Sequence, residues 1–124
     1  MQNVALRDIA FEVCEYFKLS KADLFGKSRT KQHAHPRQVA FYLAYRLTKR
    51  STTQIGKYFN RDHTTVMHGE RKIDEKLKDI DLNFDITQAI NTITRNLTDK
   101  APDFFVFSYR FNPVVVNLHP IEIK

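Results

Sequence analysis

Two helix-start signals near the middle of the chain limit the fold more than any other feature. Ser51-Thr52-Thr53-Gln54 is typical of a capping box, in which the Ser51 hydroxyl and the Gln54 amide satisfy each other's free backbone donors. Asp62 is a second candidate N-cap. These signals predict a short helix through about Phe59, a turn at residues 60–61 and a longer helix, which together form a candidate helix-turn-helix. The predicted buried stripe of the longer helix is Val66, Ile73, Leu77 and Ile80.

Helical spacing of apolar residues extends over most of the first 100 positions. Residues 4–18 predict an amphipathic helix, followed by a short helical turn that Ser20 caps and Gly26 ends. Residues 27–35 then form a predicted basic loop. Pro36 suits the first position of a third helix, which we expect to run to about Arg50. Asp85 is the predicted cap of a last helix with a buried stripe at Ile86, Ile90, Ile93 and Leu97.

The periodicity changes after Lys100, where apolar residues alternate with polar ones and Asn112-Pro113 interrupts the run. The sequence therefore predicts a mainly α fold, a helix-turn-helix bundle of about six helices over residues 1–100, with a small β-hairpin extension over residues 101–124. A lone hairpin is marginal in water. We expect this tail to mediate a homodimer, and the competing interpretation is that it folds back onto its own helices.

Positive charge is concentrated in one part of the chain. Between Leu24 and Arg61 there are nine Lys or Arg residues and no acid, whereas the remainder holds 11 basic and 14 acidic residues. This asymmetry indicates a polyanionic partner, although a solvated basic face without a partner stays an alternative. A membrane is a less suitable partner because the basic stretch lacks a large apolar face of its own.

Several function classes lack support in the sequence. The three glycines, at positions 26, 56 and 69, form no phosphate-cradling loop, so we expect no nucleotide and no cofactor. The histidine pairs, His33 with His35 and His63 with His68, lack the further ligands of a metal site. No catalytic constellation is present, and an enzyme is not expected. Cys14 is interpreted as a core residue, and the absence of a signal segment or membrane span predicts a cytoplasmic protein.

The first turn of the predicted longer helix is unusual in composition. His63, Thr64 and Thr65 follow Asp62, and none of the four residues favours a helix interior. In a helix-turn-helix this turn faces base edges in the major groove of DNA. Short side chains that hydrogen-bond or touch a methyl group suit that position. The alternative is that these residues only cap the helix.

Several strings place the chain beside a known family. They are Pro36-Arg37-Gln38-Val39-Ala40-Phe41-Tyr42-Leu43, Leu47-Thr48, Ile55-Gly56-Lys57-Tyr58-Phe59, Arg61-Asp62-His63-Thr64-Thr65-Val66-Met67-His68 and Arg71-Lys72-Ile73. Over residues 3–98 the chain resembles the C-terminal DNA-binding domain of the bacterial replication initiator DnaA. The resemblance implies an all-helical fold that binds a short duplex site similar to TTATCCACA.

The resemblance also implies roles for individual residues. Arg29 matches an arginine that enters the minor groove, where a narrow A·T-rich groove concentrates negative potential. The major-groove readers are Thr53, which stands where some relatives have proline, and Asp62, His63, Thr64 and Thr65. The implied phosphate contacts are Lys27 and Lys31 of the basic loop, together with Arg37, Gln38 and Arg61. We expect a DNA-binding regulator of replication or transcription, of phage or other mobile-element origin, and the alternative is an interaction module that acts through the tail.

Overall fold

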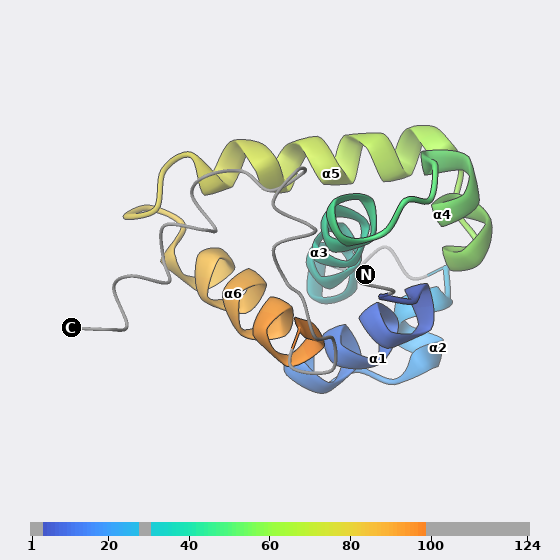
Figure 1. The fold of residues 1–124 in the computed structure, drawn as a ribbon, viewed down its shortest axis with the longest axis horizontal. Coiled ribbons are helices and arrows are strands. Elements are labelled where there is room, and N and C mark those ends of the chain that lie inside the picture. Colours follow the sequence, from blue (N-terminus) through green and yellow to red (C-terminus); the bar gives the residue numbers. More distant parts are fainter. Residues whose placement is uncertain (1–3, 28–30, 99–124) are drawn as a thin grey trace.

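A computed structural model of the chain describes residues 4–27 and 31–98, and these residues form six helices (Figure 1). The mainly helical architecture is thus confirmed, while the predicted hairpin lies outside the described residues. The helices are α1 (Leu6–Phe17), α2 (Lys21–Phe25), α3 (Lys31–Leu47), α4 (Thr52–Phe59), α5 (His63–Leu77) and α6 (Phe84–Thr98). Across the described ranges, no helix is both long and apolar enough to cross a membrane.

Helix α3 lies at the centre of the domain. All six residues from 39 to 44 are at most 2% exposed, so α3 has no solvent-facing side over almost two turns. A helix that is apolar on all sides must be surrounded by other elements. Figure 1 shows how this is achieved, with α5 along one side of α3 and with α1 and α6 along the other.

The helix-turn-helix is confirmed with the predicted start signals in place. Ser51 forms a capping box with Gln54, and Asp62 caps α5. Between the helices, Asn60 takes a left-handed conformation with φ of 61°, which asparagine tolerates better than most residues. Gly56 allows this tight turn because a Cβ atom there would lie 2.4 Å from the carbonyl oxygen of Arg61.

The predicted start of the third helix was wrong. Helix α3 begins at Lys31 rather than at Pro36, so half of the expected basic loop is helical and Pro36 lies inside the helix. Contacts with α2 explain the difference. Nε2 of His33 lies 3.7 Å from a carboxylate oxygen of Asp23, and Nε of Arg37 donates to the carbonyl of Leu24 at 2.9 Å. These contacts stabilise the helical turns around a proline that would otherwise favour a helix start.

Other predicted boundaries need smaller corrections. Helix α3 ends at Leu47 and not near Arg50, because the Thr48 hydroxyl turns back to the carbonyl of Ala44 at 2.7 Å. Ile80 does not extend the buried stripe, since α5 ends at Leu77 and Ile80 is only half-buried. Asp85 lies in the first turn of α6 rather than at its cap. The stripes at Val66, Ile73 and Leu77 and at Ile86, Ile90, Ile93 and Leu97 are buried as predicted.

Arg46 fixes how α3 crosses α5. Its guanidinium donates to Glu70 at 2.7 Å and to Asp74 at 3.0 Å, and it lies 4.9 Å from the centre of the Tyr42 ring. Nearby acidic partners raise the pKa of Arg46 against the opposing effect of burial. The arginine therefore pairs with two carboxylates and offsets the repulsion between them next to the core.

Arg46→Ala should lower the free energy of unfolding by about 2 to 3 kcal/mol, because it leaves two partly buried carboxylates without their partner. Chemical denaturation with urea provides the measurement. Arg50→Ala, which removes an exposed arginine a few residues away, is the matched control and should change stability by less than about 0.5 kcal/mol. Equal effects of the two substitutions would contradict a role for Arg46 in the packing of α3 on α5.

Candidate nucleic-acid interface

The amino-terminal turn of α5 is exposed and held in a defined conformation. A carboxylate oxygen of Asp62 accepts a hydrogen bond from the Thr64 backbone amide at 3.0 Å and another from the Thr64 hydroxyl. These two bonds lower the pKa of Asp62 below its ordinary value. All four residues from 62 to 65 are exposed. Capping by Asp62 is thus confirmed, and the same turn leaves side chains accessible to a partner.

A basic groove lies directly beside this turn. Its volume is about 610 Å³, and its walls come from α3, the turn before α5, α5 itself and Lys27, which follows α2. None of the described residues that line it is acidic, while four are Lys or Arg. The amino terminus of α5 adds the positive end of a helix dipole. The lining residues are Lys27, Ala34, Arg37, Gln38, Phe41, Asn60, Arg61, Thr65, His68, Gly69 and Lys72.

The structure brings some of the predicted site residues together and leaves others apart. Lys27, Gln38 and Thr65 share the basic groove with the two predicted arginines at positions 37 and 61. Thr53 lies elsewhere, exposed in the first turn of α4. Arg29 is outside the described residues. Lys31 is the first residue of α3, and the structure describes its backbone only.

Sequence reasoning missed His68 and Lys72 as members of the site. Both line the basic groove, three and seven positions after Thr65. This spacing places the three residues along one side of α5. Helical periodicity counted from Thr65 could have identified them. In the described part of the chain, no three His, Cys, Asp or Glu side chains gather closely enough to hold a metal ion.

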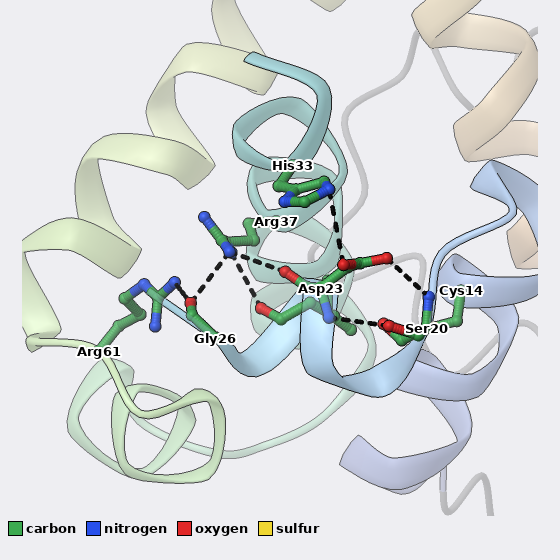
Figure 2. Close-up of polar contacts among 8 residues, drawn as sticks. Cys14, Ser20, Asp23, Gly26, His33, Arg37 and Arg61 are labelled. Carbon is green, nitrogen blue, oxygen red and sulfur yellow. Dashed lines mark hydrogen bonds and ion pairs between the residues drawn. The ribbon is translucent and has the colours of Figure 1, made fainter. Parts of the chain in front are cut away.

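Arg37 and Arg61 are engaged within the protein to an extent that the sequence did not indicate. Arg37 is only 6% exposed and donates to backbone carbonyls at the end of α2. Arg61 donates to the Gly26 carbonyl (Figure 2). It also donates to the carbonyl of Asn60 at 3.0 Å. The phosphate contacts that the resemblance implies for these arginines stay predictions.

Comparison with known families identifies the helix-turn-helix. Residues 6–73 match the family described as the bacterial dnaA protein helix-turn-helix, and this range covers more than half of the chain. It spans α1 to most of α5, and so includes both the cap at Asp62 and the basic groove. The chain belongs to the bacterial DnaA helix-turn-helix family.

Relatives of this DnaA-type chain are much longer proteins. It is 42% identical over 97 residues to the chromosomal replication initiator protein DnaA of Ruegeria sp. (strain TM1040), a match that covers 77% of this chain and 20% of the relative. The DnaA protein of Cereibacter sphaeroides (strain ATCC 17029 / ATH 2.4.9) is 47% identical over 75 residues, covering 60% and 16% respectively. The protein from Burkholderia multivorans is 41% identical over 87 residues, covering 68% and 17%. The chain therefore spans about a fifth or less of the length of these relatives.

The Asp62 cap of α5 in this DnaA-type domain should make stability depend on pH. Because the pKa of Asp62 is lowered in the folded state, its contribution is present above the unfolded pKa of about 3.9 and is lost as the pH falls through the folded value. Asp62→Asn keeps an oxygen that accepts from the Thr64 amide but does not titrate. Thermal unfolding from pH 7 to pH 3 should therefore show a smaller loss of stability for the variant than for the wild-type chain. Parallel acid profiles would contradict the assignment of the cap to the Asp62 carboxylate.

Proposed function

We propose that this chain binds duplex DNA sequence-specifically, at sites similar to TTATCCACA, and thereby regulates replication initiation or transcription. One observation carries the proposal. The exposed turn at residues 62–65 lies beside a groove whose described lining includes four Lys or Arg and no acid. Such a surface combines groups that can read bases with charge that attracts phosphates. Its membership of the DnaA helix-turn-helix family supports the same conclusion.

In the proposed complex, the amino-terminal turn of α5 enters the major groove. The carboxylate of Asp62 caps the helix through Oδ2. Oδ1 lies 3.8 Å from Nδ1 of His63, beyond hydrogen-bond distance, and can accept from a cytosine amino group. The Thr64 hydroxyl is held by the same cap, which directs its methyl group to a defined place where it can contact a thymine methyl. His63, Thr65 and Thr53 supply the remaining base contacts.

Phosphate contacts lie on either side of this turn in the proposed complex. Lys27 and Gln38 approach one DNA strand from the basic groove, together with Lys31 at the start of α3. Lys72 adds a positive charge that the sequence analysis did not assign. Arg29 enters the adjacent minor groove. These contacts set the register of the protein on DNA, whereas the α5 turn selects the sequence.

The proposed role is binding and not ATP hydrolysis. The three glycines of the chain contribute no phosphate-cradling loop. Gly26 ends α2, Gly56 permits the tight turn after α4, and Gly69 lies within α5 against Phe41. We therefore propose that occupancy of the DNA site is itself the regulatory event, in association with the bacterial nucleoid.

Replacing Thr64 or His63 by Ala should weaken binding to a TTATCCACA duplex by about 1 to 3 kcal/mol and change binding to a scrambled duplex little. Each substitution removes a base contact and leaves the phosphate contacts in place. Fluorescence anisotropy at fixed salt measures both affinities. Thr92→Ala is the control because it lies on α6, which contributes no residue to the basic groove, and it should leave both affinities unchanged. Equal losses on the two duplexes would show that this turn does not read the sequence.

A second candidate function is homodimerisation through the tail. Apolar side chains are exposed on the described domain around a cleft of about 650 Å³, where Leu82 is 79% exposed and Phe84 is 55% exposed. Asp81 and Asp85 line the same cleft. The aromatic segment at residues 104–111 contains an arginine at position 110, so it complements the cleft in both hydrophobicity and charge. We propose that the tail of a second copy occupies this cleft.

Light scattering over a dilution series tests this dimer. The full chain should become dimeric at high micromolar concentration, while a chain that ends at Lys100 stays monomeric. Leu82→Ser in the full chain should also weaken the dimer, because it removes an apolar contact in the cleft. A full-length chain that remains monomeric, with a truncated chain that is merely less stable, would show that the tail covers its own domain.

A further inference from the structure

The carbonyl group of Gly26 accepts hydrogen bonds from two arginines that come from different parts of the chain. Nη2 of Arg37, on α3, donates to it at 2.9 Å, and Nη2 of Arg61, in the turn before α5, donates to it as well (Figure 2). Gly26 ends α2, and Lys27 of the basic groove follows it directly. One backbone oxygen therefore connects α2, α3 and the helix-turn-helix.

Each arginine also binds other carbonyls nearby. Arg37 donates through Nε to Leu24 at 2.9 Å and through Nη2 to Asp23 at 2.7 Å. Arg61 donates to Asn60 and makes longer contacts with the carbonyls of Phe25 and Phe59. The last carbonyls of a helix lack partners within the helix, and guanidinium groups are well suited to satisfy them. The two arginines therefore complete the carboxyl-terminal end of α2.

Placing two positively charged guanidiniums side by side and away from water is energetically unfavourable unless their hydrogen bonds offset the cost. Burial lowers the pKa of both guanidiniums, and the charge of Arg61 lowers that of Arg37 further. A phosphate that bound Arg37 directly would have to reach a side chain that is only 6% exposed. It would also compete with three carbonyl acceptors already in place. Arg37 is thus poorly placed to contact a phosphate directly, and it is well placed to hold α2.

We propose that Arg37 and Arg61 are positioning residues, which clasp the end of α2 between α3 and the helix-turn-helix and so fix where Lys27 stands relative to α5. This inference rests on the proposed DNA-binding function and deepens it. Without the clasp, Lys27 and the α5 turn would contact DNA independently. With it, both contacts belong to one rigid frame, so binding pays less entropy to order them.

A double-substitution cycle on DNA affinity separates positioning from direct contact. Lys27→Ala alone should weaken binding to the TTATCCACA duplex. In an Arg37→Ala background, the factor by which Lys27→Ala weakens binding should be at least about threefold smaller. The plot of log affinity against log salt should lose about one unit of slope in either single variant, and the double variant should lose no more. If Lys27 and Arg37 instead bound phosphates independently, their losses of binding free energy would add. The double variant would then lose about one further unit of salt slope.

Conservative substitution gives a second discrimination. Lysine binds phosphate well as a point charge but cannot donate in several fixed directions at once. Arg37→Lys should therefore behave like Arg37→Ala in the cycle with Lys27. Restoration of most of the affinity by lysine would overturn the proposal in favour of a direct phosphate contact.

Hydrogen exchange in the free protein tests the clasp without DNA. Arg61→Ala should speed exchange of the Gly26 amide, which donates to Ala22 at 2.8 Å. The ring of Phe25 stacks on Phe59 with 5.4 Å between their centres, so α2 stays attached and this variant should fold. Unchanged exchange in both Arg61→Ala and Arg37→Lys would overturn the clasp. A wild-type chain that does not distinguish TTATCCACA from a scrambled duplex would instead refute the proposed function, while faster exchange would still establish the clasp.

Discussion

The burial of residues 39–44 of α3 on every side is the constraint on which the rest of the structure depends. A helix without a free face needs partners around its whole circumference, and α1, α5 and α6 provide them. Polar side chains that flank this buried stretch must then find partners near the core. Arg37 finds them in the carbonyls of α2, and Arg46 finds them in the carboxylates of α5. The central helix therefore fixes the positions of the elements that form the candidate DNA surface.

Helix α5 gains its stability away from its exposed turn. Val66, Ile73 and Leu77 are fully buried, and the Asp62 cap satisfies the free backbone amide of Thr64 at the start. His63, Thr64 and Thr65 contribute little to helix formation. Because the core and the cap stabilise the helix, the residues at these exposed positions need not favour helix formation. Their side chains are available for contact with a partner.

Local signals predicted the helix-turn-helix well, and long-range contacts account for what was missed. The capping box at Ser51 and the cap at Asp62 depend on residues two or three positions apart, so the sequence displays them directly. Pro36 misled the prediction because contacts between α2 and α3, which join residues ten and 13 positions apart, override its local preference. The partners of Arg37 are backbone carbonyls, which any residue type supplies. No sequence pattern could therefore have revealed that Arg37 is buried within the domain.

The electrostatics of α5 also depend on α3. Three acids follow the exposed turn along this helix, and uncompensated they would repel a phosphate backbone. Glu70 and Asp74 both pair with Arg46, which leaves one net negative charge instead of two. Glu75 pairs with Lys78 at 3.8 Å and stands 13 positions after Asp62, which corresponds to about 20 Å along the helix. Because the screening length at physiological salt is about 8 Å, the charge of Glu75 is weak at the amino-terminal end of α5, which we propose faces DNA. The ion pairs that pack α5 on α3 thus also leave the basic groove as the dominant charge beside Thr65.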